Sequence, residues 1–346
     1  MPAKQEGLKP ALETLINGRV LDENEARAAF ELIMDGRAPA AQIAAFLVAL
    51  RIRGETVGEI AAFARVMRAR ATSVPVDVEG LIDTCGTGGD GSGSFNISTL
   101  AAIVAAAAGA RVAKHGNRSV SSRCGSADLL QGLGVRVEST PQEMAESIQT
   151  FGFGFLFAPA LHGAMKHAAP IRKELGMRTV FNLLGPLTNP AGARRQLVGV
   201  FDATWVEPIA EVLRQLGCER ALVVHGGGMD EIAIHDETRV ADLDGGNLRT
   251  YTLTPEDAGL RRAQAADVMG GEVEENVAIA TSVLQGTKGP RRDVVVLNAA
   301  AALLIADRAA TLREGVEMSS RTIDSGAAMS LLDSMRAKGP ASRKGA

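Results

Sequence analysis

The chain has 346 residues, which is enough for two domains or for one large one. Hydrophobic residues make up 46% of the sequence and aromatic residues only 3%, so the core is expected to consist mainly of Ala, Val, Leu, Ile and Met. The net charge of −3 provides no basic field, which argues against nucleic acid and anionic membranes as partners. Three scattered cysteines and a polar N-terminus without an apolar signal segment are typical of a cytoplasmic protein.

Residues 1–74 are predicted to form a helical domain. Thr56 and Glu59 have the spacing of a capping box, and apolar residues follow at helical spacing. So short a segment cannot bury every apolar face within itself, so we expect part of its surface to form a homodimer contact. The boundary with a second domain, 75–346, is placed where the helical pattern ends at a proline.

The second domain is predicted to be an α/β domain with a largely parallel sheet, because short apolar runs alternate with helical segments. The predicted strands are 81–84, 111–113, 135–137, 153–157, 197–201 and 221–224. The predicted helices are 100–108, 141–151, 204–216, 273–284 and 293–306. Between 238 and 253 the pattern changes to that of a β-hairpin.

A glycine-rich stretch stands between the first predicted strand and the first predicted helix of this domain. Backbone N–H groups can approach a ligand closely there, because glycine has no Cβ atom. Polar residues then open the helix, whose N-terminus suits a phosphate group, and a second polar loop follows at 114–122. Two such loops joined by one helix predict a ligand with two phosphate groups. The glycines are Gly86, Gly88, Gly89, Gly91 and Gly93.

Other interpretations of the glycine-rich stretch fit less well. The spacing of Gly86, Gly88 and Gly91 matches the dinucleotide fingerprint, but no helix opens at the last glycine. Lys114 stands where an acid that binds the ribose is expected. No Gly-Lys-Ser/Thr sequence is present, which excludes a P-loop. A purely structural loop remains the alternative, and the polar residues clustered around it disfavour that alternative.

Two adjacent acidic residues, Asp230 and Glu231, follow a predicted strand and three glycines. Adjacent carboxylates are often a solvated surface pair. Here, however, they follow the carboxyl end of a strand, which is where α/β proteins bind ligands. Magnesium prefers oxygen ligands and bridges carboxylates to substrate phosphates. The sequence therefore favours a Mg²⁺ site.

The segments DTCGTGGDGSGSFNIST (83–99) and KHGNRSVSSRCGSADLL (114–130) resemble the substrate-binding signature of the anthranilate phosphoribosyltransferases, which have the pyrimidine nucleoside phosphorylases as relatives. The resemblance extends to 157–191 and 225–234. It implies Mg²⁺-dependent transfer of the phosphoribosyl group of 5-phosphoribosyl 1-diphosphate to the amine of anthranilate, a step of tryptophan synthesis. It also implies a homodimer held by the N-terminal helices.

The resemblance assigns roles to three sets of residues. The set for phosphoribosyl diphosphate is Gly86, Gly89, Asp90, Ser94, Asn96, Ile97, Ser98, Thr99, Lys114, His115, Gly116, Asn117, Arg118, Ser119, Val120, Ser121, Ser122 and Ser126. The set for anthranilate is Gly86, Asn117, His162 and Arg172. The set for the metal is Ser98, Asp230 and Glu231. In this reaction diphosphate leaves the ribose while the amine attacks, so positioning and stabilisation of the leaving group are expected to carry catalysis.

Three alternative functions fit the sequence of this chain less well. A pyrimidine nucleoside phosphorylase has a longer C-terminal domain and a Lys-x-Ser-x-Arg motif, where this chain has Arg172 followed by Lys-Glu. The other major phosphoribosyltransferase fold has an acidic pair that leads into a phosphate loop, whereas Ile232 and further apolar residues follow the pair here. A non-catalytic binding module is disfavoured by the intact acidic pair.

Overall fold

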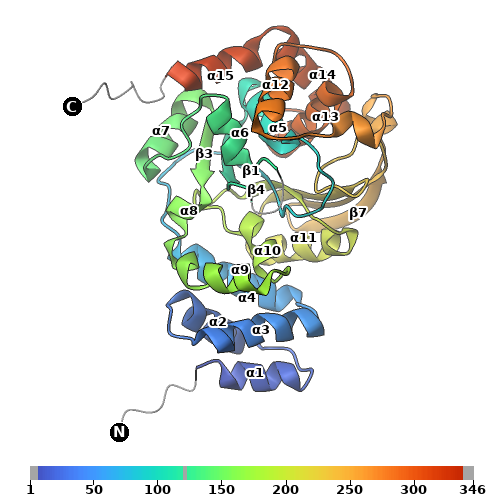
Figure 1. The fold of residues 1–346 in the computed structure, drawn as a ribbon. Coiled ribbons are helices and arrows are strands. Elements are labelled where there is room, and N and C mark those ends of the chain that lie inside the picture. The colour runs from blue at the N-terminus through green and yellow to red at the C-terminus, as the bar shows by residue number, and fades with distance from the viewer. Residues whose placement is uncertain (1–6, 120–122, 338–346) are drawn as a thin grey trace, which may run out of the picture.

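The computed structural model describes residues 7–119 and 123–337. Its elements form a layer of helices stacked on an α/β part that contains the sheet (Figure 1). The first four helices are α1 (Lys9–Ile16), α2 (Glu23–Met34), α3 (Ala40–Arg53) and α4 (Val57–Arg70). Thr56 and Glu59 cap each other's backbone N–H groups at the start of α4, which confirms the predicted capping box.

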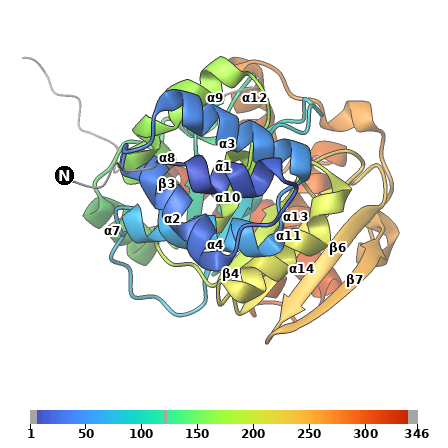
Figure 2. The ribbon, with the colours of Figure 1, turned by 90° about the horizontal axis from the view of Figure 1, so that it is seen from below.

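The helical layer also contains segments from the middle of the chain. α9 (Ala169–Leu175) packs against α3, and α10 (Phe181–Leu184) packs against α4. The ring of Phe181 lies 5.3 Å from that of Phe30, which stacks on Phe63 at 4.6 Å. Seen from below, these helices lie over one end of the molecule (Figure 2). The core of the layer therefore joins the first helices to residues that follow the third strand.

The α/β part is built on one seven-stranded sheet with the strand order β3-β2-β1-β4-β5-β6-β7. The first five strands in this order, β3, β2, β1, β4 and β5, run parallel to one another. β6 pairs antiparallel with β5, and β6 and β7 form an antiparallel hairpin at this edge of the sheet. The predicted α/β class, parallel sheet and hairpin are thus confirmed. The strands are β1 (Leu81–Gly86), β2 (Arg111–Gly116), β3 (Phe153–Phe157), β4 (Arg195–Gly199), β5 (Arg220–Gly226), β6 (Thr238–Asp244) and β7 (Asn247–Leu253).

The predicted strand at 135–137 is wrong. The Val135 N–H donates to the carbonyl oxygen of Leu130 at 2.9 Å and so closes the end of α6 (Ser126–Gly132). The Val135 side chain is buried in the core of the α/β part. The apolar residues therefore indicated burial correctly, but the backbone N–H of Val135 bonds to the end of a helix and not to a neighbouring strand.

Helices cover both faces of the sheet. On one face α5 (Ile97–Ala107) packs against α13 (Pro290–Ile305), and buried alanines on both helices let the two backbones approach closely. On the other face α11 (Val206–Gln215) lies between β5 and α4, which joins the sheet to the helical layer. The remaining α-helices are α7 (Pro141–Phe151), α8 (Ala158–Leu161), α12 (Val273–Leu284), α14 (Leu312–Asp324) and α15 (Ala327–Ala337). The 3-10 helices are η1 (Gly163–His167), η2 (Gly185–Leu187), η3 (Ala203–Trp205), η4 (Pro255–Ala258) and η5 (Ala265–Val268).

The order of the strands reverses at β1. The chain passes from β1 outward to β2 and β3 and then returns to β4 on the opposite side of β1. In open α/β sheets, ligands bind outside the carboxyl ends of the strands at such a point. The candidate site therefore lies where β1, β2, β4 and β5 end, at Gly86, Gly116, Gly199 and Gly226.

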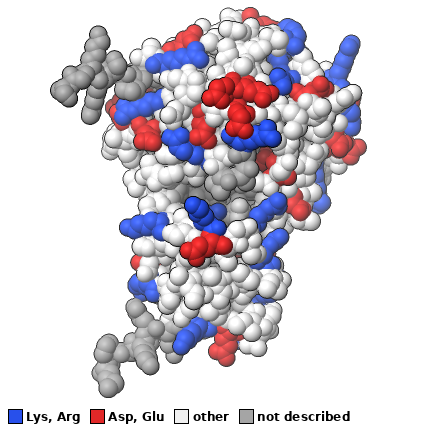
Figure 3. All heavy atoms as spheres, in the orientation of Figure 1, with Lys and Arg blue, Asp and Glu red and all other residues white. Residues whose placement is uncertain are grey.

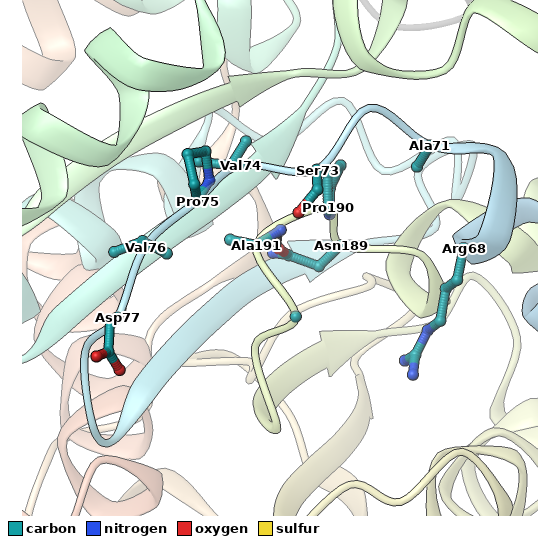
Figure 4. Close-up of a pocket in the computed structure, with 11 residues that line it drawn as sticks. Arg68, Ala71, Ser73, Val74, Pro75, Val76, Asp77, Asn189, Pro190 and Ala191 are labelled. Atoms are coloured by element: carbon teal, nitrogen blue, oxygen red, sulfur yellow. Dashed lines mark hydrogen bonds between the residues drawn. The ribbon is translucent and has the colours of Figure 1, made fainter.

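A cavity of about 570 Å³ lies elsewhere, where the segment after α4 runs beside residues 189–192 (Figure 4). Two of its polar side chains are already engaged by protein groups. Arg68 donates to two backbone carbonyl groups, and Asn189 donates to Asp83. This cavity therefore belongs to the connection between the helical layer and the α/β part, away from the carboxyl ends of the strands.

The surface carries charges of both signs. On the face shown in Figure 3, Lys and Arg side chains alternate with Asp and Glu side chains, so no continuous field of one sign covers it. The surface is hollowed between the two stacked parts in this view. Among the helices that the structure describes, none has both the length and the apolar composition to cross a bilayer.

Candidate functional site

The first glycine-rich loop folds back onto the acidic pair. Gly88 and Gly89 adopt positive φ angles, which residues with a side chain rarely adopt. The Gly88 N–H donates to Oδ2 of Asp230 at 2.7 Å. Asp90 accepts hydrogen bonds from Ser92, and its Oδ2 accepts the N–H of Asp230 at 3.1 Å. The loop after β1 and the loop after β5 are therefore one connected structure.

Helix α5 begins at Ile97, closer to this loop than predicted, and its first turn contacts the acidic pair. The Ser98 N–H donates to Oε1 of Glu231 at 3.0 Å. Ile97 and Thr99 are buried, so their side chains face the core and only their backbone can reach a ligand. A carboxylate already occupies the position at this helix N-terminus that suits an anion.

Lys114 is buried beneath the first loop rather than extended toward solvent, with 2% of its surface exposed. Its ammonium group donates to the carbonyl of Thr84 and to Oγ of Ser98, the latter at 3.3 Å. Burial lowers the pKa of Lys114, against the opposing attraction of Asp83 and other nearby acids. The Lys114 side chain is thus held in a fixed position next to Ser98, at the floor of the site.

The acidic pair concentrates negative charge in the cleft. Burial and the charge of Asp230 raise the pKa of Glu231 to about 8. Burial, together with the neighbouring Asp90, also raises the pKa of Asp230, although part of the Asp230 surface stays open to solvent. Like charges held this close favour a bound cation, because a cation offsets their repulsion.

The donor set of this pair suits magnesium. Within residues 7–119 and 123–337, no group of three His, Cys, Asp or Glu side chains forms a complete metal cage. Two adjacent carboxylates, with the Ser98 hydroxyl nearby, are the kind of partial set that Mg²⁺ takes from protein. The rest of its coordination normally comes from water and substrate phosphates.

Asn298 on α13 holds the backbone just after the acidic pair. Its Oδ1 accepts the N–H of Ile232 at 3.0 Å, and its Nδ2 donates to the carbonyl of the same residue at 2.9 Å. Asn298 is fully buried. No role was predicted for Asn298 from the sequence. The sequence signal that could have identified Asn298 was its position as a polar residue within the apolar part of a predicted helix.

The second polar loop is held by Asp128, in the first turn of α6. The Asp128 carboxylate accepts the N–H groups of Ser119 and Gly125, and the guanidinium of Arg118, each at 3.0 Å. Arg118 is thus engaged by an acid, and its role as a phosphate ligand stays a prediction. Three more residues predicted for this loop lie outside the described residues: Val120, Ser121 and Ser122.

The start of this loop follows directly from β2. Gly116 is the last residue of β2, and Asn117 comes next. The carbonyl oxygen of Asn117 accepts a hydrogen bond from Oγ of Ser126 at 3.1 Å. The structure therefore brings Ser126 to the carboxyl end of β2, as the predicted site requires.

His115 and His162 form a buried, hydrogen-bonded pair. Nδ1 of His115 faces the carbonyl oxygen of Gly185 at 3.2 Å, so we assign the proton to this nitrogen. Nε2 of His115 then accepts from Nε2 of His162 at 3.1 Å, which leaves Nδ1 of His162 with a lone pair. Burial lowers the pKa of His115 to about 3 and that of His162 to about 4, so both rings are neutral near pH 7.

A buried polar network supports this histidine pair. The His115 N–H donates to Asp83 at 3.0 Å, and Asn189 donates to the same carboxyl at 2.7 Å. Burial raises the pKa of Asp83. No chemistry was predicted for Asp83 from the sequence, although an acidic residue inside an apolar strand was a signal of a special environment.

Arg172 lies on α9, on the side of the helical layer. It is partly buried, and its guanidinium carbon lies 5.0 Å from the centre of the Phe181 ring. Burial lowers the pKa of Arg172. No ion-pair partner for Arg172 is found in the part of the chain that the structure describes, in contrast to Arg118. A partly buried guanidinium without an acidic partner favours an anionic ligand.

The chain matches two models of the glycosyl transferase family, the helical bundle domain over residues 9–71 and the a/b domain over residues 78–329. It is 56% identical over 330 residues to the anthranilate phosphoribosyltransferase of Symbiobacterium thermophilum, a match that covers 95% of this chain and 97% of that protein.

Two solved structures have the same fold. The anthranilate phosphoribosyltransferase from Thermus thermophilus has a TM-score of 0.90 and 50% identity, over 94% of this chain and 98% of that one. The enzyme from Saccharomyces cerevisiae in complex with PRPP and Mg has a TM-score of 0.87 and 27% identity, over 95% of this chain and 97% of that one. With two polar loops and an acidic pair at the carboxyl edge of the sheet, the chain belongs to the anthranilate phosphoribosyltransferases, transferases of tryptophan biosynthesis.

Proposed function

We propose that the chain transfers the phosphoribosyl group of 5-phosphoribosyl 1-diphosphate to the amine of anthranilate and that the reaction depends on Mg²⁺. One observation carries this proposal. The backbone of the glycine-rich loop and that of the α5 N-terminus both donate to the acidic pair, at Gly88–Asp230 and Ser98–Glu231. A phosphate loop and a metal-binding pair in direct contact are what a metal-bound diphosphate requires.

Each part of the site has a role in this proposal. Asp230 and Glu231 would hold Mg²⁺ with Ser98 nearby, and the chemistry this ion supplies is neutralisation of the departing diphosphate. Lys114 donates a hydrogen bond to Oγ of Ser98 and would orient that hydroxyl toward the metal. The bond from ribose C1 to the diphosphate oxygen breaks, and a bond from C1 to the anthranilate nitrogen forms. Positioning and charge stabilisation therefore contribute most of the rate enhancement.

Arg172 and His162 would face anthranilate. The Arg172 guanidinium offers a planar, two-point match to the carboxylate of the substrate. The amine loses a proton after it attacks C1. The lone pair on Nδ1 of His162 is suited to accept that proton, because the protonated form of an attacked aromatic amine is a strong acid. Asn117 and the backbone of Gly86 complete the proposed anthranilate set.

The proposal includes a homodimer in the cytoplasm and a division of the chain into a helical domain, 1–74, and a catalytic domain, 75–346. Exposed apolar residues on the helical layer support the dimer, since Ile16 and Ile52 are 76% and 81% exposed. The absence of a disulfide bond among the three described cysteines supports a reducing compartment.

The test is a fluorescence assay. Purified protein is mixed with anthranilate, phosphoribosyl diphosphate and Mg²⁺, and the loss of anthranilate fluorescence is followed. We expect loss only when all components are present, and none when EDTA replaces Mg²⁺. Phosphate-dependent cleavage of thymidine, without any loss of anthranilate fluorescence, would instead support the nucleoside phosphorylase alternative.

A further inference from the structure

A segment from the last third of the chain lies against the first phosphate loop. The Phe95 N–H donates to the carbonyl of Val268 at 3.2 Å, and the Gly270 N–H donates to the carbonyl of Gly93 at 2.9 Å. A Cβ atom at Gly270 would lie 2.7 Å from Cα of Phe95, so the two backbones are in direct contact. The loop that leads into α5 is therefore held from outside by the segment that leads into α12.

Asn276, in the first turn of α12, extends this contact into the site. It is 3% exposed. Its Oδ1 accepts the N–H of Gly271 at 2.9 Å, so its Nδ2 faces Asn96 and donates to Oδ1 of that residue at 3.2 Å. Because Oδ1 of Asn96 is the acceptor, Nδ2 of Asn96 points the other way and donates to the carbonyl of Cys124 at 2.9 Å.

We propose that Asn276 is a positioning residue of the phosphoribosyl diphosphate site. It fixes the orientation of the Asn96 amide and, through that amide, holds Cys124, which follows the second polar loop, against the N-terminus of α5. Asn96 is the residue that precedes the first turn of α5. If its amide turned over, its oxygen would face the carbonyl of Cys124 and the hydrogen bond between Asn96 and Cys124 would be lost. The inference rests on the proposed function, in which both loops contact one diphosphate.

The variant that tests this is Asn276→Asp. Aspartate keeps the oxygen that accepts the Gly271 N–H, but it removes the donor to Asn96 and places a carboxylate oxygen against Oδ1 of that residue. We expect the Kd for phosphoribosyl diphosphate with Mg²⁺, measured by calorimetry, to rise about tenfold, the effect of losing one buried hydrogen bond. The KM for phosphoribosyl diphosphate should rise in parallel, while the KM for anthranilate stays within about twofold.

A double-mutant cycle separates positioning from general damage to the fold. If Asn276 acts through Asn96, the change Asn276→Asp should have less than about a twofold effect on this Kd in a protein that already carries Asn96→Ala. Asn247→Asp, an exposed change at the first residue of β7, serves as the control and should leave the Kd unchanged.

Three outcomes would overturn the inference. The first is an Asn276→Asp protein with wild-type affinity, and the second is a full additional loss in the Asn96→Ala background. The third is an equal rise of both KM values together with a lower melting temperature, which indicates a purely structural role. A wild-type protein that binds no phosphoribosyl diphosphate would refute the proposed function itself, and the inference with it.

Discussion

The backbone carbonyl of Asp230 lies directly against Gly199, the last residue of β4, so that a Cβ atom at position 199 would overlap the Asp230 carbonyl oxygen. The loop that carries the acidic pair can approach the end of β4 because this position has no side chain, and Gly86 at the end of β1 leaves room for the Asp230 carboxyl in the same way. The Gly88 N–H to Asp230 hydrogen bond depends on the same approach.

We therefore expect Gly199→Ala to displace the acidic pair. Overpacking of this kind typically costs about 1–3 kcal/mol of stability, and the shift should lower transfer activity at limiting Mg²⁺ by more than about tenfold. Gly58→Ala is the matched control, because nothing lies within 4 Å of a Cβ atom at that position. Activity should be measured across a Mg²⁺ titration. A Gly199→Ala protein with the wild-type titration curve would show that the loop tolerates displacement.

The double change Asp230→Asn and Glu231→Gln tests the metal assignment. It removes two carboxylates that repel each other in a buried setting, so the melting temperature in the absence of Mg²⁺ should stay equal to that of wild type or rise. Most Mg²⁺-dependent activity should be lost, because the ion loses its protein ligands. Full activity of the double variant at limiting Mg²⁺ would rule this assignment out.

The histidine pair predicts how stability depends on pH. In the unfolded chain a histidine titrates near 6.5, whereas burial lowers the pKa of His115 to about 3 and that of His162 to about 4. Between pH 6.5 and 4 the unfolded state takes up protons that the folded state excludes. The contribution of the two neutral rings to the free energy of unfolding is therefore fully present above about pH 6.5. It falls as the pH drops, by about 2 kcal/mol per ring at pH 5.

Denaturant unfolding at pH 7.5 and at pH 5 checks this prediction. Other groups also titrate in this range, so the comparison is between wild type and His162→Asn. The variant should lose less stability between the two pH values, because it lacks one of the excluded protons. An identical loss in both proteins would mean that His162 is protonated in the folded state. Neither ring changes its charge between pH 6 and 8, so the two histidines should cause no change in the KM for anthranilate over this range.

The exposed apolar side chains of the helical layer predict a homodimer. Ile16, at the end of α1, and Ile52, near the end of α3, are among the most exposed large apolar residues that the structure describes. We expect sedimentation at micromolar concentration to show a dimer, and Ile16→Glu with Ile52→Glu to shift it toward monomer. Tyr251→Ser, on the edge strand β7, should leave the dimer intact. A fully active wild-type monomer would contradict the prediction.

Local patterns were enough to predict the parallel strands, the hairpin and the glycine-rich loop between β1 and α5, because glycine runs, capping boxes and apolar alternation act over a few residues. The contacts that support the site join distant segments. His115 on β2 contacts His162, and Asn298 on α13 holds Ile232 in the loop after β5. No local pattern specifies such a pair, because it depends on how the elements pack. The strand predicted at 135–137 was wrong for the same reason, because the Val135 N–H bonds to the end of α6 instead of to a neighbouring strand.

The last prediction concerns Arg172. Its guanidinium lies over the Phe181 ring and has no acidic partner among the described residues, so a substrate carboxylate would be its natural counter-ion. We expect Arg172→Ala to raise the KM for anthranilate by about ten- to hundredfold, which corresponds to roughly 1.5–3 kcal/mol for a charge-assisted hydrogen bond. The KM for phosphoribosyl diphosphate should change much less. Lys173→Ala, an exposed change on the same helix, controls for a general loss of positive charge.

Arg172→Lys separates the two-point match from charge alone. Lysine keeps the charge but not the planar pair of donors, so its effect should fall between those of wild type and the alanine variant. If the alanine variant retains the wild-type KM for anthranilate, or if only the KM for phosphoribosyl diphosphate rises, Arg172 does not bind the carboxylate. The stacking on Phe181 would then be its whole role, and the loss should appear in the melting temperature instead.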